Sequence, residues 1–170
     1  PDSVLHLWLL TREESFRPGS SFLHRNQEKG FYSLFFFARA MADEDLIERE
    51  LDLIVYTNGS QQVADEAVPY PEKATVLGPC KVLPREFPGI HCRTIDIDIA
   101  HTEEDKGFSL AKLTKRNNVS KDTSEEISPA IIELMHKELY AIVDDGVYAY
   151  RNNVRWQLQY DHAASEIDNK

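Results

Sequence analysis

The stretch Pro69–Asp98, PYPEKATVLGPCKVLPREFPGIHCRTIDID, combines a helix pattern, a proline-rich turn and a strand pattern. Pro71 suits a first helical turn, because proline lacks only an N–H that a helix start leaves free. Gly78 and Pro79 fall in the middle of the helical pattern, so we expect a short or kinked helix. Two prolines and a glycine within residues 84–89 then predict its end.

A strand pattern follows at His91–Asp98. Polar and small side chains on one side alternate with larger ones on the other, which is the period of a β-strand. The first side carries Cys92, Thr94, Asp96 and Asp98, and the other carries Arg93, Ile95 and Ile97. A helix, a turn and a strand in this order need an α/β setting to bury them.

Two further apolar runs lie upstream of this unit. Val4–Leu10 is nearly continuous in apolar residues, which is typical of a strand buried on both faces of a parallel sheet. Leu51–Thr57 is a second strand candidate, and Asn58-Gly59 after it is a turn signal. Residues 11–29 are polar and predict a long loop. With a helix at Gly30–Asp43, the order β-α-β-α-β predicts a parallel sheet with crossover helices.

The predicted helix Gly30–Asp43 is apolar on more than one side. One face at helical spacing is formed by Phe31, Leu34, Phe35, Ala38 and Met41. Phe36 and Phe37 fall outside this face, so the helix needs a second partner besides the sheet. We interpret the run Phe35–Phe37 as core plus interface rather than as a ligand-binding box.

The C-terminal third contains a polar segment, a helix and a hairpin. Residues 101–127 are polar and mixed in charge, and predict an insertion or loop. Ser128-Pro129 predicts the start of a helix that continues to about Ile142. Two strand-like runs, 147–151 and 154–160, flank Asn152-Asn153 and predict a β-hairpin. Residues 161–170 form a polar tail.

Composition fits one soluble domain and excludes several partners. The chain has 170 residues and a net charge of −10, which disfavours binding to nucleic acid or to an anionic membrane. It has no run long enough to span a membrane and no secretory signal pattern, so we expect a cytoplasmic protein. Cys80 and Cys92 are expected to be buried free thiols.

The sequence offers little catalytic chemistry. No two of the seven glycines are spaced for a dinucleotide-binding turn, and no phosphate-binding loop is present. The six histidines show no metal-ligand spacing. Tyr148 and Asn152 formally match Tyr-x-x-x-Asn, but they lie on the predicted hairpin, whereas this motif requires a helix.

Two further pairs of residues are candidate sites, the neighbours His91 and Cys92 and the carboxylates Asp96 and Asp98. His91 and Cys92 are neighbours on a strand, so their side chains point to opposite faces and cannot pair. Asp96 and Asp98 share a strand face near a carboxyl end, where α/β sheets often bind ligands. Solvated strand-end carboxylates are the expected interpretation for both. We therefore predict no catalytic, cofactor-binding or metal-binding residue in this chain.

Five segments together resemble the N-terminal, structural half of the ketoreductase region of modular polyketide synthases. They are HLWLL, FYSLFFFARAMA, LIVYTNGSQQV, PEKATVLGPCKVLPREFPGIHCRTIDID and VYAYRNNVRWQLQY. The resemblance implies a truncated Rossmann-like, short-chain-dehydrogenase-like fold of three layers, spanning residues 1–160. Asn152-Asn153 stands where family members often have Gly-Gly, and it also suits a type I′ turn.

The resemblance also implies a function. The chain would stabilise and position a catalytic half in the same polypeptide, which binds NADPH and reduces a β-ketoacyl thioester on an acyl carrier protein. NADPH and the catalytic Ser, Tyr and Asn or Lys belong to that half. One alternative is an independent interaction or dimerisation module within a multienzyme. Another is a small α/β enzyme with an unrecognised site, for which Asp96 and Asp98 are the only hints.

Overall fold

The computed structural model describes residues 3–11, 20–46, 48–99 and 129–160. These fall into two compact units, the larger made of Pro1–Asp98 with Val143–Lys170 and the smaller of Ile99–Ile142. The polar segment 101–127 and the tail 161–170 predicted from the sequence lie outside the described residues. The smaller unit contributes one described helix, α4 (Pro129–Leu139), which is shorter than the helix predicted to reach Ile142.

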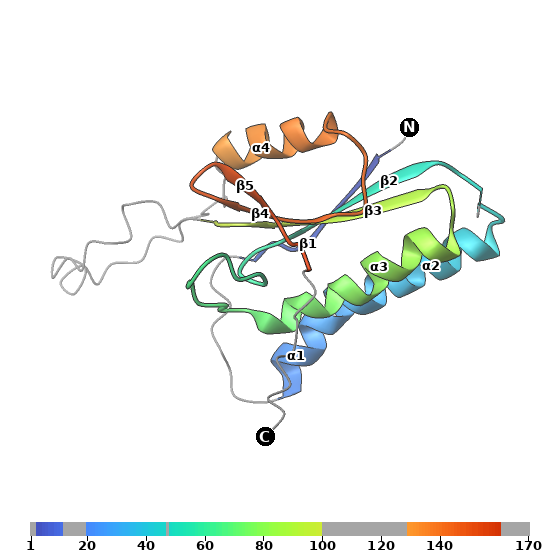
Figure 1. The fold of residues 1–170 in the computed structure, drawn as a ribbon. Helices are drawn as coiled ribbons and strands as arrows, with labels where there is room; N and C mark the ends of the chain where they lie inside the picture. The colour runs from blue at the N-terminus through green and yellow to red at the C-terminus, as the bar shows by residue number, and fades with distance from the viewer. Residues whose placement is uncertain (1–2, 12–19, 47, 100–128, 161–170) are drawn as a thin grey trace, which may run out of the picture. The chain divides into compact units, whose positions relative to one another are not determined.

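The larger unit is built on a five-stranded sheet in the order β1-β2-β3-β4-β5 (Figure 1). Its strands are β1 (Ser3–Leu9), β2 (Leu51–Thr57), β3 (Ile90–Ile97), β4 (Val147–Arg151) and β5 (Val154–Gln157). The first four are parallel, and β5 runs antiparallel to β4. The predicted α/β fold, with a mainly parallel sheet and a C-terminal hairpin, is confirmed.

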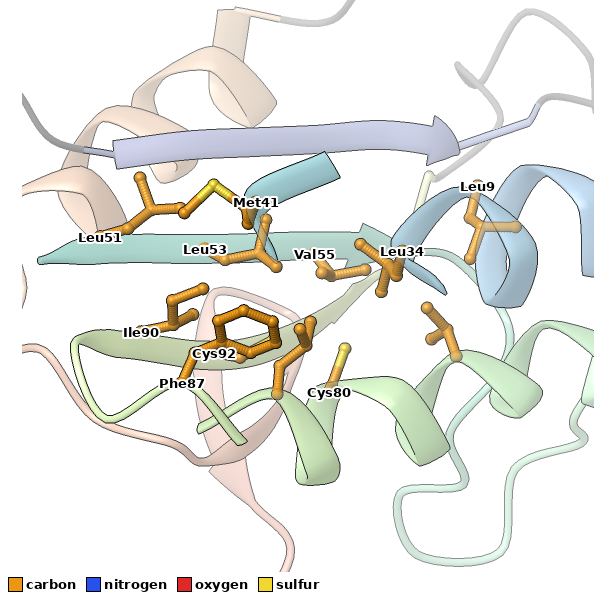
Figure 2. Packing of buried hydrophobic residues seen from close by; sticks show 12 residues of the cluster. Leu9, Leu34, Met41, Leu51, Leu53, Val55, Cys80, Phe87, Ile90 and Cys92 are labelled. Atoms are coloured by element: carbon orange, nitrogen blue, oxygen red, sulfur yellow. The ribbon is translucent and has the colours of Figure 1, made fainter. Parts of the chain in front are cut away.

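Helices of the larger unit lie side by side on one face of this sheet (Figure 1). The first run comprises α1 (Ser20–Gln27), the π-helix η1 (Glu28–Tyr32) and α2 (Ser33–Asp43). The second comprises the 3-10 helix η2 (Pro71–Val76) and α3 (Leu77–Glu86). Their buried side chains meet those of β2 and β3 in one hydrophobic core (Figure 2).

Residues 20–29, predicted as part of a long loop, are helical instead. The prediction was wrong because this segment is polar and, among residues 22–29, the buried side chains are those of Phe22 and Asn26. They stand one turn apart, and Asn26 Nδ2 donates a hydrogen bond to the Phe22 carbonyl at 3.2 Å. Two inward positions are too few to produce a recognisable helical stripe.

The core face of α2 differs from the predicted one. Leu34 and Met41 are buried, and Phe37 and Ala38 pack against the same core. These four positions follow the spacing i, i+3, i+4, i+7. Phe31 and Phe35, assigned to the apolar face by the sequence pattern, are instead exposed to solvent. The prediction assumed a uniform α-helix from Gly30 onward. It was wrong because the five-residue π-helix η1 shifts the helical phase just before Ser33.

The strand β1 is an edge strand rather than a strand buried on both faces. Among the described strands it pairs with β2 alone. Most of its residues are half-buried, and Trp8 is 64% exposed. In contrast, every residue of β2 is buried, as its apolar sequence predicted.

The helix after Pro71 breaks earlier and ends later than predicted. It changes from 3-10 to α geometry at Leu77, and Pro84 lies inside α3 instead of closing it. Pro79 is the third residue of α3, where an N–H has no partner within the α-helix. The end comes at Phe87, which is extended, as expected for the residue before Pro88.

Two predicted turns are confirmed by backbone angles. Gly59 has φ of 66° in the turn after β2. Asn152 and Asn153 have φ of 51° and 63°. Positive φ at both central residues is the requirement of a type I′ hairpin turn, and asparagine tolerates it better than most residues.

Candidate functional site

The carboxyl ends of β2, β3 and β4 meet at one edge of the sheet, where parallel α/β folds usually bind ligands. Asp96 lies at this edge and is only 1% exposed. Its Oδ1 accepts hydrogen bonds from Thr57 Oγ1 at 2.7 Å, Ser60 N at 2.9 Å and Ser60 Oγ at 2.8 Å. This carboxylate is therefore held by the chain itself.

Arg151, the last residue of β4, completes this cluster. Its Nη2 donates to Asp96 Oδ2 at 2.8 Å and to the Gln61 carbonyl at 3.0 Å. Its Nε lies 2.7 and 2.9 Å from the two carboxylate oxygens of Glu66. Burial alone would lower the pKa of Arg151, but the hydrogen bonds and charges of Asp96 and Glu66 outweigh burial and raise that pKa. We call Asp96, Arg151 and Glu66 the edge triad.

A second polar cluster lies around Lys73, which is fully buried. Lys73 Nζ donates to Thr11 Oγ1 at 2.7 Å and to Asn58 Oδ1 at 2.8 Å, and lies 4.3 Å from the centre of the Tyr70 ring. Asn58 also exchanges hydrogen bonds with the Thr11 backbone, at 3.0 and 2.9 Å. These contacts tie the end of β1 to the turn after β2.

The structure separates the two aspartates that the sequence placed together. Asp98 lies beyond the end of β3 and is exposed, as a solvated carboxylate should be. For Asp96 that expectation is wrong, because its oxygens are buried and hydrogen-bonded. The sequence reasoning missed Arg151 and Glu66. A signal did exist, since an arginine within an apolar hairpin strand requires a charged partner if it is buried.

Tyr148 and Asn152 do not form the reductase motif that their spacing suggests. Tyr148 lies on β4 and Asn152 in the hairpin turn, as predicted. The Tyr148 hydroxyl donates a short hydrogen bond to Asp144. Burial, together with Asp144, raises the pKa of Tyr148. A catalytic tyrosine in a reductase requires the opposite shift, towards neutrality.

His91 and Cys92 point to opposite faces of β3, as predicted. His91 is exposed, with Nδ1 3.5 Å from Asp145 Oδ1. Cys92 lies in the core, and both it and Cys80 are buried free thiols. A hydrogen bond with Cys80 and burial raise the pKa of Cys92, which suppresses the reactive thiolate. Within the described ranges, no three His, Cys, Asp or Glu residues are grouped to hold a metal ion.

Aromatic side chains of the first helical run form an exposed surface. Phe35 and Phe36 are 53% and 59% exposed, with ring centres 5.6 Å apart. Phe31 and Tyr32 form a second edge-to-face pair in η1, at 5.3 Å. We call these four residues the aromatic face. An exposed apolar surface of this kind is a candidate interaction site.

The strand order and the helices on one face of the sheet define a truncated Rossmann-like α/β fold. The polar side chains at its carboxyl edge pair with one another. A solved structure with this fold is described as the adenylation, ketoreductase, and pseudo Asub multidomain structure of a keto acid-selecting NRPS module. The TM-score is 0.62 and the identity 22%, over 91% of this chain and 11% of that chain. The chain thus spans about a tenth of that protein.

Other comparisons add no family name. A scan against protein-family models finds no match, and a search of curated proteins finds none either. In the part of the chain that the structure describes, none of the helices has the length and hydrophobicity needed to cross a lipid bilayer.

Proposed function

We propose that this chain is the structural, non-catalytic half of a ketoreductase region in a cytoplasmic polyketide synthase. It stabilises and positions a catalytic half that binds NADPH and reduces a β-ketoacyl thioester carried on an acyl carrier protein. The edge triad is the observation that carries this proposal. It fills the carboxyl edge of the sheet, the usual ligand site of such folds, with groups that bind one another.

The energetics of the edge triad favour a structural role. A ligand entering there would have to displace Arg151 from Asp96, leaving a buried carboxylate without its cation. Separating a buried ion pair in this way costs about 3–5 kcal/mol. The edge therefore contributes rigidity, and the catalytic groups are assigned to the partner half.

The parent enzyme is proposed from two kinds of support. The motifs within Pro69–Asp98 favour a polyketide synthase. The similar solved structure is described as containing a ketoreductase within a multidomain NRPS module, which supports a setting in a large modular synthase. In either setting the chain would be one framework piece of a multienzyme.

Cofactor binding and turnover test the proposal directly. Titration of the chain with NADPH should give no saturable binding, and a model β-ketothioester should not be reduced. Addition of the catalytic half from the same synthase should raise that half's melting temperature and its rate of NADPH oxidation. Micromolar NADPH binding or measurable turnover by this chain alone would overturn the proposal.

The exposed aromatic face supports a second candidate, an independent interaction or dimerisation module. Light scattering on the isolated chain and on Phe35→Asp and Phe36→Asp variants separates the two ideas. A dimer that both variants dissociate, and that the catalytic half does not displace, would favour this candidate. Phe37 is unsuitable for this test because it packs against the core.

A further inference from the structure

The helices do not cover the whole of the sheet face on which they lie. Cys92 points to this face, where it contacts the core beneath α3. Alternation along β3 places Thr94 and Asp96 on the same face. Their partners in β4 are Val147 and Ala149, which therefore continue that face beyond β3.

The outer hairpin strand extends this face further. Ala149 pairs with Trp156 and Arg151 with Val154, so both β5 side chains lie on the helix-bearing face. Leu158 follows Trp156 at the same two-residue period. All three are exposed: Val154 by 53%, Trp156 by 49% and Leu158 by 41%.

Trp156 and Leu158 border a hollow. It has a volume of about 330 Å³ and lies between the hairpin and residues 61–64 of the loop after β2. Val147, Ala149, Trp156 and Leu158 form its apolar wall. We call it the hairpin hollow. An apolar sheet face is normally covered by a second layer, and an exposed one marks an interaction site.

The polar rim of the hairpin hollow is uncharged. It consists of glutamine residues, namely Gln61, Gln62, Gln157 and Gln159. Arg151 nearby is paired with both Glu66 and Asp96, so its positive charge is compensated within the edge triad. A partner with a neutral, apolar contact surface fits this rim. A second copy of the chain is disfavoured, because its net charge of −10 would be brought against an equal charge.

The end of the described hairpin returns to the helices. Lys81 Nζ on α3 donates to the Tyr160 hydroxyl at 3.2 Å and lies 4.8 Å from the centre of that ring. Tyr160 thus reaches α3 from the hairpin, on the face that carries the hollow. Polypeptide attached after this point would start beside the hollow at high effective concentration.

We propose that the hairpin hollow binds an amphipathic helix of the ketoreductase catalytic half. The helix would cover β4 and β5 as α3 covers β3, where Cys80 and Leu83 pack on the sheet. It would present an uncharged apolar face to Trp156 and Leu158. This inference rests on the proposed function, since the catalytic half is the partner named there.

The two tryptophans of the chain provide matched reporters. A Trp8→Phe variant leaves Trp156 in the hollow as the sole tryptophan. A Trp156→Phe variant leaves Trp8, which is 64% exposed on the opposite edge strand β1. On titration with the purified catalytic half of the same synthase, fluorescence of Trp156 should shift to the blue with saturation. Fluorescence of Trp8 should stay unchanged.

A charge introduced into the hollow tests the same surface independently. Leu158→Glu should weaken binding of the catalytic half by about tenfold or more, because a carboxylate would be desolvated in the interface. Leu23→Glu on α1 is the matched control, because Leu23 is a leucine with the same exposed fraction of 41%, and it should bind as the unaltered chain does. Circular dichroism melts check that both variants fold, as the exposure of both side chains predicts.

The outcomes separate this inference from the proposed function. Two results would overturn the hollow as the docking site and leave the function standing. One is a complex detected by sedimentation in which only the fluorescence of Trp8 shifts, and the other is a loss of binding in Leu23→Glu but not in Leu158→Glu. If a complex sediments but the fluorescence of Trp156 does not shift, the hollow is likewise ruled out as the docking site. Failure of the catalytic half to associate at all would overturn the proposed function, and the inference with it.

Discussion

Arg151 holds the carboxyl edge of the sheet together at the scale of single residues. It joins strand β4 to Asp96 at the end of β3 and to Glu66 in the loop after β2. Its guanidinium offers planar donors to two carboxylates at once, which lysine cannot reproduce. One side chain therefore links three segments that are distant in the sequence.

Replacing Arg151 should destabilise the fold strongly. Arg151→Met leaves Asp96 buried beside Thr57 and Ser60 without a cation, so we expect the free energy of unfolding to fall by about 3–5 kcal/mol. Urea denaturation followed by circular dichroism measures this change. The control is Arg39→Met, which removes an exposed ion pair with Asp43 and should cost less than about 1 kcal/mol. Equal losses in the two variants would contradict the structural role of the edge triad.

His6 makes a separate residue-scale contribution that depends on pH. Its Nε2 lies 2.8 Å from Ser33 Oγ, which in turn donates to the Lys29 carbonyl at 2.7 Å. The hydroxyl hydrogen is used in that second bond, so the imidazole is the donor in the first. Burial lowers the pKa of His6 from its ordinary value of 6.5, because it disfavours the charged ring.

Stability should therefore fall on mild acidification. Below pH 6.5 the unfolded chain binds a proton at His6 that the folded chain does not yet accept, so the free energy of unfolding decreases as pH falls through this range. Melting temperatures between pH 7.5 and 5 should drop less steeply in His6→Gln than in the unaltered chain. An identical slope in His6→Gln would refute this assignment.

At the scale of elements, the close approach of η1 to the end of β1 depends on Gly30. A Cβ built at Gly30 would lie 2.9 Å from Leu9 Cδ1, and Leu9 is fully buried. Gly78 near the start of α3 offers a contrast, since its nearest contact would be Phe31 Cε2 at 3.9 Å. The two glycines are both helical but differ in the space around them.

Alanine substitutions at these two positions should have opposite effects. Gly30→Ala should destabilise the fold by about 1–3 kcal/mol through overpacking against Leu9. Gly78→Ala should be neutral or stabilise by up to about 1 kcal/mol, because alanine has the higher helix propensity. Chemical denaturation of the two variants side by side measures both effects. A stabilising Gly30→Ala would show that the helix can move away from β1 without cost.

At the scale of the larger unit, the sheet keeps the packed core of a Rossmann-like fold, but its carboxyl edge is not open for a ligand. The sheet and its helices form a well-packed core around β2 and β3. The carboxyl edge, which usually carries the ligand, is instead closed by the edge triad and by the Lys73 cluster. Apolar surface remains exposed on the aromatic face and at the hairpin hollow. The distribution of these features favours a framework that binds other protein surfaces.

The sequence by itself determined the elements whose patterns are local. Strands β2 and β3, the helical start at Pro71 and the Asn152-Asn153 hairpin were all predicted and are confirmed. Side-chain period, proline geometry and positive φ depend on backbone sterics within a few residues, so a single sequence reports them. The β-α-β-α-β order of these elements predicted a parallel sheet, and strands β1 to β4 are parallel.

Only the tertiary structure decided the phase of α2, the edge position of β1 and the partners of Asp96. The phase depends on the π-helix η1. The exposure of β1 depends on which strands stand beside it, and the Asp96–Arg151 pair joins residues 55 positions apart. None of these follows from a uniform local period, because the π-helix interrupts the α-helical period before α2, and strand order and side-chain partners are set only when the chain has folded.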